Sequence, residues 1–359
     1  MYLDRRGFVL TGSAALLSGC ATLPSAPCSP LPLVHVDPAR VLRSYACLRP
    51  YRASGFVVRR EQLGDKLLVH NYGHGGAGIT LSWGSSALAA SLGVPGHSGP
   101  IAVIGAGVMG LTTARLLQEA GFAVTIYAAQ VPPDTTSNLA GGQWGPTGHY
   151  RESKVTPEWR SQYKAALAIS WQRFRALDGE RYGIRWLPTY TEAERVGPPG
   201  LEPYYPDSRL LSPGDHPFRS GDLAVYRTMY VETGRFMAQL VRDFLEAGGR
   251  MLIRRFDSTE QVTALPERLI FNCTGLGSRA LFGDTALEPV RGQIVVLAPQ
   301  PEVQYALTLP AGYMFPRADG IILGGTFERG EWSTVPEPAT IQGILRSHQR
   351  LFGNLRCIA

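Results

Sequence analysis

Short apolar runs, each followed by a glycine-rich turn, set the pattern of this chain. The runs Ile101–Ile104 and Val124–Tyr127 have the length and composition of buried strands. Between them, Leu111–Ala120 reads as a helix, and Gly121 suits the left-handed cap that ends a helix. A strand, a helix and a second strand in quick succession predict a βαβ unit, and with it a parallel sheet covered by helices.

Strand-like and helix-like stretches recur along the rest of the chain. We expect strands at Gly55–Arg60, Lys66–His70, Tyr226–Val231 and Met251–Phe256, a strand-to-glycine turn at Leu269–Gly275, and a hairpin of Gly312–Pro316 and Ile321–Phe327. We expect helices at Ile79–Leu92 and Glu232–Ala247, and a third that opens at Thr156-Pro157 and places Tyr163, Leu167, Trp171 and Phe174 in the core. Leu33–Ser44 is ambiguous and is taken as one strand, and Glu194–Arg219 suits a lid or a wall of a substrate domain.

The turn after Ile104 carries three glycines in the spacing G-x-G-x-x-G. At this spacing Gly105 permits a tight turn, Gly107 lets the backbone approach a pyrophosphate, and Gly110 lets the helix pack closely on the strand. The helix N-terminus offers unpaired N–H groups and the positive end of its dipole to the phosphates. The sequence therefore predicts a dinucleotide site.

The ribose side of that site departs from the usual pattern. An acidic ribose ligand ordinarily stands about twenty residues after the glycines. Here that place reads Ala128-Ala129-Gln130, without a carboxylate. This argues against an ordinary NAD site, and it leaves the ribose contact to Gln130, to backbone atoms, or unmade.

Composition and charge exclude other classes of function. The chain has 359 residues, 44% of them hydrophobic, which is enough for a large core in two intertwined domains. Its net charge of +6 comes from scattered Lys and Arg residues, so we expect no nucleic-acid partner. The five cysteines show no zinc spacing, and buried free thiols are expected, with Cys273 structural. The glycines around His70 and His74 break any helix, so we expect no metal there and a hydrogen-bonded structural role for each.

The first residues resemble an export signal. Asp4-Arg5-Arg6-Gly7-Phe8-Val9-Leu10 is similar to a twin-arginine signal, and the apolar run Phe8–Leu17 suits a signal-peptide core. Leu17-Ser18-Gly19-Cys20 resembles a lipobox, in which Cys20 is acylated and becomes the mature N-terminus. We therefore expect a protein that is exported and lipid-anchored to the bacterial cell envelope, with Ala21–Pro32 as a tether. If this interpretation fails, the protein is expected in the cytoplasm.

A glycine-dense segment lies ahead of the first Rossmann strand. From His70 to Thr80 the chain reads HNYGHGGAGIT, and this density indicates backbone lying close against a ligand. Together with Arg49-Pro50 before it and Trp83-Gly84 after it, the segment resembles the closing segment of the D-amino-acid oxidase family, which are FAD enzymes. Thr135–Pro146 resembles the flavin loop of that family. The turn after Leu269–Asn272 and the strands around Tyr313 also resemble the corresponding parts of the family.

The resemblance implies an α/β fold in which a Rossmann-type FAD-binding domain is interleaved with a mixed-sheet substrate domain. In the family the closing segment ends the chain, so its position here implies a circular permutation, which neighbouring chain termini permit. The expected division is a signal peptide at 1–20, a tether and first strand at 21–45, the permuted FAD-closing segment at 46–92, a linker at 93–100, the FAD-binding Rossmann half at 101–155, substrate domain at 156–225 and 291–359, and the second part of the FAD domain at 226–290.

The resemblance also implies a reaction. In that family a hydride leaves Cα of a D-amino acid for flavin N5, the imino acid hydrolyses to a 2-oxo acid and ammonia, and O2 reoxidises the flavin to give hydrogen peroxide. It places Arg49 at the substrate carboxylate, which its forked guanidinium suits, Tyr313 beside it, and the carbonyl of Gly76 at the substrate amine. A second pocket tyrosine of the family is replaced by Leu309, for which Tyr305 is a candidate substitute.

The same resemblance implies a set of cofactor-binding residues and one question of specificity. The residues expected to bind FAD are Gly75, Gly76, Gly78, Ile79, Thr80, Gly105, Gly107, Val108, Met109, Gly110, Ala128, Thr135, Thr136, Ser137, Gly141, Gly142, Gln143 and Val262. An acidic substrate would need one more cation at the pocket mouth, and Arg317 is the candidate.

Three functions are compatible with the sequence. The first is a D-amino-acid oxidase whose partners are a small D-amino acid and O2. The second keeps the flavin but passes electrons to a membrane quinone, which a membrane tether favours. The third is a non-catalytic amino-acid-binding lipoprotein. The absence of a carboxylate at 128–130 favours this function, because we expect it to weaken FAD binding. A homodimer is compatible with the sequence, which specifies neither the oligomeric state nor the preferred D-amino acid.

Overall fold

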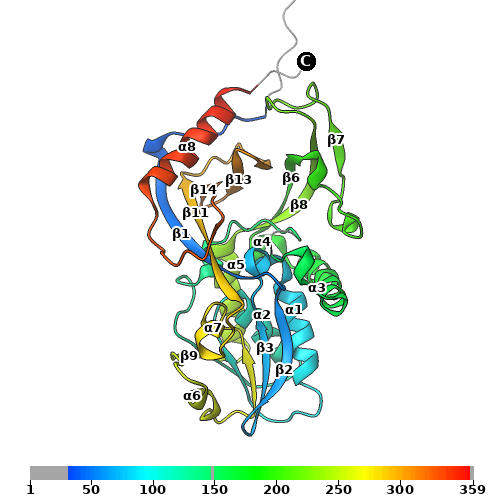
Figure 1. Ribbon diagram of the computed structural model, residues 1–359, viewed down its shortest axis with the longest axis vertical. Coiled ribbons are helices and arrows are strands. Elements are labelled where there is room, and N and C mark those ends of the chain that lie inside the picture. Colours follow the sequence, from blue (N-terminus) through cyan, green and yellow to red (C-terminus); the bar gives the residue numbers. More distant parts are fainter. Residues whose placement is uncertain (1–30, 147–148, 356–359) are drawn as a thin grey trace, which may run out of the picture.

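Two sheets organise the chain, and each is built from strands that lie far apart in the sequence (Figure 1). The structure is a computed structural model that describes residues 31–146 and 149–355. The predicted export signal and lipobox, with Cys20, Cys28 and Cys357, lie outside the described residues. No helix of the described part is long and apolar enough to cross a membrane.

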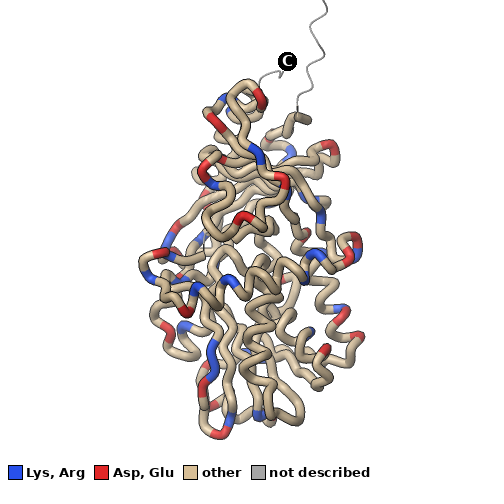
Figure 2. The backbone as a smooth tube through the Cα atoms, turned by 90° about the vertical axis from the view of Figure 1, so that its right-hand side faces the viewer, with Lys and Arg blue, Asp and Glu red and all other residues tan. Residues whose placement is uncertain are grey.

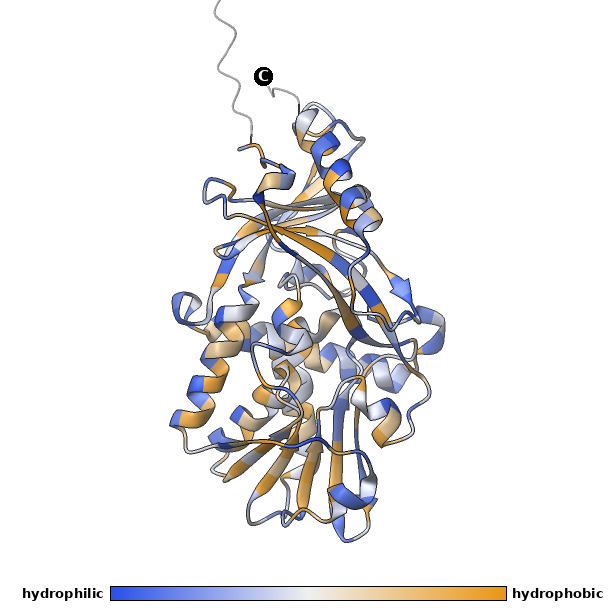
Figure 3. Cartoon of the chain, turned by 90° about the vertical axis from the view of Figure 1, so that its left-hand side faces the viewer, coloured by the Kyte–Doolittle hydropathy of each residue, from blue (hydrophilic) through white to orange (hydrophobic). Residues whose placement is uncertain are grey.

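The smaller sheet has six strands in the order β2-β3-β10-β4-β5-β9. Their bounds are β2 (Val57–Leu63), β3 (Lys66–Tyr72), β10 (Leu269–Asn272), β4 (Ile101–Ile104), β5 (Val124–Ala128) and β9 (Arg250–Ile253). β2 is antiparallel to β3, and all other neighbours are parallel. Every residue of β4, β5 and β10 is buried, as expected of apolar runs in a parallel sheet, and Figure 3 shows the hydrophobic colour along these strands.

Helices cover the smaller sheet and bury their apolar faces. The longer ones are α1 (Gly78–Gly93), α2 (Val108–Glu119), α3 (Pro157–Ala176) and α5 (Thr233–Glu246), and α1 packs against both α2 and α3. Thr156 caps α3 by accepting a hydrogen bond from the N–H of Trp159 at 3.2 Å. The prediction that Tyr163, Leu167, Trp171 and Phe174 lie in the core is confirmed.

The larger sheet is mixed and has nine strands. Its path is β1 (Val41–Arg52), β11 (Leu287–Leu297), β14 (Gly320–Gly324), β13 (Gly312–Arg317), β12 (Ala306–Leu309), β6 (Ile184–Glu192), β8 (Leu223–Val231) and β7 (Arg209–Leu211), with β15 (Glu328–Arg329) beside β11. β1 and β11 pair antiparallel from Val41 opposite Leu297 to Arg52 opposite Leu287. The predicted fold class, a Rossmann-type sheet interleaved with a mixed sheet, is confirmed.

The remaining elements are short, apart from the C-terminal helix. They are α4 (Gly179–Tyr182), α6 (Thr259–Thr263), α7 (Gly277–Leu281) and α8 (Pro338–Gly353), with 3-10 turns at η1 (Pro38–Arg40), η2 (Gly75–Ala77), η3 (Thr136–Leu139), η4 (Glu152–Lys154), η5 (Ala193–Arg195) and η6 (Glu202–Tyr204).

Several predicted boundaries were wrong; the strand expected at Ile321–Phe327, for example, ends at Gly324. The helix after the glycine motif begins at Val108 rather than Leu111, because Gly107 is extended and caps it inside the motif. The strand expected at Met251–Phe256 ends at Ile253, and the N–H of Arg254 instead bonds the carbonyl of Ala128 at 2.9 Å. Leu33–Ser44 is not one strand, since Pro38–Arg40 forms a 3-10 turn before β1 begins.

Candidate active site

A cavity of about 610 Å³ is lined by residues of both sheets. From the smaller sheet come the residues that follow the carboxyl ends of β3, β4, β5, β9 and β10. From the larger sheet come residues of β1, β11, β12 and β13. Ligands of open parallel sheets bind outside the carboxyl ends of the strands, so this cavity is the expected place for a dinucleotide.

The glycine motif forms a cradle at the start of α2. Gly105 has φ +110°, and a Cβ there would stand 2.4 Å from the carbonyl oxygen of Cys273. A Cβ at Gly110 would stand 1.8 Å from the carbonyl oxygen of Gly105, so the helix packs directly on the turn. The hydroxyl of Ser137 accepts a hydrogen bond from the N–H of Val108 at 3.0 Å, which places the flavin loop against the helix N-terminus. This cradle fits the pyrophosphate of FAD.

The segment ahead of the Rossmann strand lines the same cavity. Gly75, Gly76, Gly78 and Ile79 all contribute to the wall. Thr80 does not line it, because its hydroxyl accepts from the N–H of Gly145 at 3.0 Å and donates to that residue's carbonyl at 3.1 Å. Thr80 therefore ties α1 to the flavin loop.

The two histidines of this segment differ in their hydrogen bonding. His70 pairs with Glu61 at 2.9 Å and with Asn272 at 2.9 Å, as a structural histidine is expected to do. His74 is stacked on Phe56 with ring centroids 4.9 Å apart, and its Nε2 has no hydrogen-bond partner within the described part of the chain. Burial lowers the pKa of His74 to about 3, so its ring is neutral at ordinary pH.

Arg49 and Tyr313 meet on the cavity face of the larger sheet. Tyr45, Cys47 and Arg49 share one face of β1, and Cys47 is paired with Gly292 of β11. The Arg49 guanidinium lies over Gly292, and its Nη1 donates to the carbonyl of Thr326 at 3.2 Å. The resulting cation faces the cavity beside Tyr313.

The hydroxyl of Tyr313 stays protonated in this setting. Its ring is stacked on Phe315, with centroids 4.6 Å apart. Burial raises the pKa of Tyr313 well above its usual value, and the nearby charge of Arg49 only partly opposes this. Tyr313 is therefore a neutral hydrogen-bond donor next to a fixed cation, a pair suited to an anionic carboxylate.

Most of the predicted site residues line this one cavity. They are Arg49, Gly75, Gly76, Gly78, Ile79, Gly105, Gly107, Val108, Met109, Ala128, Thr135, Thr136, Ser137, Gly141, Gly142, Gln143 and Tyr313. Gly110, Thr80 and Val262 do not line it. Val262 is fully buried on α6, where it packs with Phe256 and Leu265 in an apolar cluster.

Tyr305 does not substitute for the missing pocket tyrosine. Its hydroxyl donates to the carbonyl of Pro32 at 2.9 Å, and its ring lies in the apolar cluster that also buries Leu309. Arg317 does not line the cavity either, because it donates to Asp319 at 2.7 Å and 2.6 Å and to Thr233 at 2.8 Å. The candidate cation for an acidic substrate is thus already paired.

Several lining residues escaped the sequence reading. Thr308 stands opposite Tyr313 on β12, and its buried hydroxyl has no partner among the residues described. Arg254, Phe256 and Asp257 line the cavity just after β9. Their position after a Rossmann strand is the signal that identifies them, but the predicted strand Met251–Phe256 covers Arg254 and Phe256 and stops one residue before Asp257. Cys273 also lines the cavity, and burial raises the pKa of its thiol to about 12, so it is no nucleophile.

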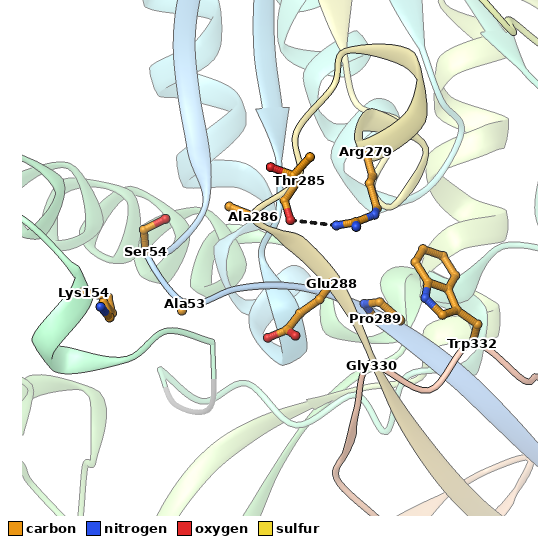
Figure 4. Close-up of a pocket in the computed structure, with 10 residues that line it drawn as sticks. All are labelled: Ala53, Ser54, Lys154, Arg279, Thr285, Ala286, Glu288, Pro289, Gly330 and Trp332. Carbon is orange, nitrogen blue, oxygen red and sulfur yellow. Dashed lines mark hydrogen bonds between the residues drawn. The ribbon is translucent and has the colours of Figure 1, made fainter.

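A second hollow of about 550 Å³ shares no lining residue with this cavity (Figure 4). There Arg279 donates to the carbonyls of Thr285 and Leu287 at 2.7 and 2.8 Å, and Glu288 is paired with Arg329. These contacts hold the start of β11 in place. Because the polar groups of the second hollow are used in these structural contacts, we assign the chemistry to the first cavity. Acidic and basic residues are interspersed along the backbone in Figure 2.

Comparison with known proteins identifies the class. The chain belongs to the DAO family of FAD-dependent oxidoreductases, whose family model matches residues 21–92 and 100–359. It is 34% identical over 263 residues to the D-amino-acid oxidase of Rubrobacter xylanophilus, covering 71% of this chain and 77% of that protein. It is 31% identical over 263 residues to the D-amino-acid oxidase of Streptomyces coelicolor, covering 70% and 77%.

Solved structures share the fold. The L-alpha-glycerophosphate oxidase of Mycoplasma pneumoniae with FAD bound matches with a TM-score of 0.55 at 13% identity, covering 72% of this chain and 79% of that chain. The protein is a FAD-dependent amino-acid oxidoreductase, and FAD is the cofactor that the glycine cradle accommodates.

Proposed function

We propose that this protein is a D-amino-acid oxidase, which converts D-amino acids, O2 and water to 2-oxo acids, ammonia and hydrogen peroxide. The observation that carries the proposal is that Arg49 lines the same cavity as the Gly105–Gly110 turn, with the neutral hydroxyl of Tyr313 beside it. When bound in this cavity, FAD would supply the acceptor for the hydride that leaves the substrate Cα.

The residues of the chain position the substrate. Arg49 binds the carboxylate with its fork, which the hydrogen bond to Thr326 holds in place. Tyr313 donates a second hydrogen bond to the same carboxylate, and the carbonyl of Gly76 accepts one from the amine. Phe315 and Ile294 line the cavity and keep water from the reacting carbon. Catalysis is then mostly orientation, and no side chain has to act as a base on Cα.

The paired state of Arg317 favours neutral substrates. Asp319 accepts two hydrogen bonds from its guanidinium, so no second free cation is offered to an acidic side chain at this position. We infer that neutral D-amino acids are preferred over D-aspartate and D-glutamate. The test of the function is an assay of hydrogen peroxide release by the purified yellow protein with a panel of D- and L-amino acids, in which only D-amino acids should react.

One alternative acceptor has support from the N-terminal sequence. A tether at Cys20 would hold the protein near membrane quinones. A dehydrogenase of this kind would reduce a quinone analogue in the presence of substrate while releasing peroxide slowly. The ratio of the rate of quinone reduction to the rate of peroxide release therefore distinguishes a dehydrogenase from an oxidase. The third function, a non-catalytic binding protein, is excluded if substrate reduces the bound flavin at all.

We propose further that the chain is circularly permuted. β3 comes before the first Rossmann strand yet lies beside β10, and the family model matches in two segments on either side of residues 93–99. Both facts support the proposal. A rearranged chain in which residues 31–92 follow the present C-terminus should bind FAD with an unchanged visible spectrum, and loss of flavin binding would count against it.

The N-terminal segment carries our proposal for localisation. We propose export through the twin-arginine motif Arg5-Arg6 and lipid anchoring at Cys20 in the cell envelope. The support is the order and spacing of the two patterns. Replacing Cys20 with Ser should release the protein from the membrane fraction, and a protein that stays in the cytoplasm with both patterns intact would contradict the proposal.

A further inference from the structure

The ribose side of the cavity lacks its usual carboxylate after β5 but has one after β9. The two strands are parallel neighbours, with Ala128 opposite Ile253, so the residues that follow them emerge at the same edge of the sheet. Asp257 follows β9 and lines the cavity. Of the described residues that line this cavity, it is the sole carboxylate.

The chain after β9 is held against the end of β5. The N–H of Arg254 donates to the carbonyl of Ala128 at 2.9 Å, which continues the pairing of the two strands beyond Ile253. The N–H of Asp257 donates to Oε1 of Gln261 at 2.8 Å, which fixes the backbone where α6 begins. Backbone contacts therefore hold the chain on either side of the Arg254–Asp257 segment, and Asp257 lines the same cavity as Ala128, Ala129 and Gln130, where the usual ribose ligand is missing.

The carboxylate of Asp257 keeps acceptor sites for a ligand. Arg255 donates to its Oδ1 at 2.7 Å, and a carboxylate has about four lone-pair sites, so acceptor capacity for two hydroxyls remains. Glu267, a buried acid that contacts β5, is differently placed. It accepts the hydroxyl of Tyr127 at 3.1 Å and does not line the cavity.

The residues around Asp257 suit an adenosine. The ring of Phe256 is buried and meets Tyr127 edge-on, with ring centroids 6.0 Å apart. The Arg254 guanidinium carbon lies over the Phe256 ring, 4.7 Å from its centroid. Both Arg254 and Phe256 line the cavity, so flat groups stand beside the carboxylate.

We propose that Asp257 binds the adenosine ribose of FAD, in place of the carboxylate that ordinarily follows the second Rossmann strand. The inference rests on FAD occupying the cavity, which is the cofactor of the proposed function. It replaces the three options that the sequence left for this contact, namely Gln130, the backbone, or no contact. The carboxylate thus follows β9 instead of β5, and it binds the ribose hydroxyls from the end of this adjacent strand.

The test measures FAD release from the full-length holoprotein on dilution, followed by the rise in flavin fluorescence. Asp257→Asn should weaken FAD binding about tenfold, the loss expected for one charge-assisted hydrogen bond. Wild-type protein should bind FAD about tenfold more tightly than an analogue without the 2′-hydroxyl of the adenosine ribose, and Asp257→Asn should bind the two nearly equally. Glu260→Gln, on α6 and not lining the cavity, is the matched control and should behave as wild type.

A second substitution that returns the carboxylate to β5 provides a test if Asp257→Asn holds its flavin poorly. Ala129 is exposed at the end of β5, so Ala129→Asp in the Asp257→Asn background should restore the preference for FAD over the analogue. The proposal is overturned if Asp257→Asn leaves that preference intact, or if Gln130→Ala abolishes it instead. Failure of the wild-type protein to bind FAD would refute the cofactor itself, which is a separate result.

Discussion

The guanidinium of Arg49 lies directly on Gly292 of the adjacent strand, where a Cβ would stand 2.3 Å from its Nη2. The missing side chain lets Arg49 extend along the sheet and reach the carbonyl of Thr326. The same arrangement recurs at Gly324, where a Cβ would stand 2.0 Å from Cζ of Tyr313. Two glycines thus determine where the two side chains that we propose to bind the substrate lie.

Gly292→Ala should damage activity more than stability. The atoms in its way are the tip of a flexible side chain, so the guanidinium moves while the sheet stays intact. A displacement of about 1 Å costs up to about 100-fold in rate, and we expect kcat/KM for the best D-amino acid to fall by that order, with FAD retained. Gly343→Ala, on α8 with nothing within 4 Å of the new Cβ, is the control and should leave kcat/KM unchanged. Unchanged kinetics in Gly292→Ala would show that Arg49 does not bind the substrate.

Arg49→Lys should keep the charge but lose the fork. A single ammonium cannot reproduce the bidentate contact, so we expect kcat/KM to fall about 100-fold, mainly through KM. Arg59→Lys is the matched control, because Arg59 is exposed and paired with Glu61 on β2. Flavin content should be normal in both variants. If both lose activity alike, the special role given to Arg49 is wrong.

Tyr313→Phe should lower kcat/KM about tenfold, since one hydrogen bond to the substrate carboxylate is lost. Burial raises the pKa of the Tyr313 hydroxyl above its usual value, so the hydroxyl stays protonated through ordinary alkaline pH. The ratio of wild-type to variant kcat/KM should therefore be constant from about pH 6 to pH 10. A ratio that falls toward one below pH 10 would show that the hydroxyl ionises in the working range.

The elements that could be predicted are those with a local signal. The apolar runs at Ile101–Ile104 and Leu269–Asn272 form buried strands. Strands of a parallel sheet that is covered on both faces consist of continuous apolar residues, so the run itself is the signal. The glycine motif located the dinucleotide cradle for a similar reason, since only glycine fits beside Cys273 at the observed φ of Gly105. Arg49 and Tyr313 were located by resemblance, and they line one cavity.

What could not be predicted depends on contacts between distant strands. Thr308 carries no local signal, because it lines the cavity only through the pairing of β12 with β13. Asp257 has only its position after β9 as a signal, and the parallel pairing of β9 with β5 brings that position to the cavity. The end of β9 was missed because the apolar residue Phe256 continues the pattern of the strand, although it packs against Tyr127 from outside the sheet. Tyr305 has the right type for the pocket but lies in the apolar cluster with Leu309 and bonds Pro32.

His74 should make the fold sensitive to acid. Its pKa is about 3 in the folded state and near 6.5 when unfolded, so protons bind the unfolded chain as pH falls below about 6.5. Its contribution to stability is complete above that pH and is lost on acidification, by about 2 kcal/mol between pH 6.5 and 5. Denaturant unfolding at fixed excess FAD should show that His74→Gln loses about 2 kcal/mol less than wild type over this range. The exposed His35→Gln is the control, and an equal loss in wild type and His74→Gln would contradict the assignment.

The central claim is that the flavin of this protein oxidises D-amino acids. Its most direct test is the visible absorbance band of the bound oxidised flavin, recorded without oxygen as D- and L-enantiomers of neutral amino acids are added. We predict that the D-enantiomers bleach this band within the turnover time and that air restores it with release of hydrogen peroxide. A band that persists with every D-amino acid, or that is bleached only by L-enantiomers, would contradict the account.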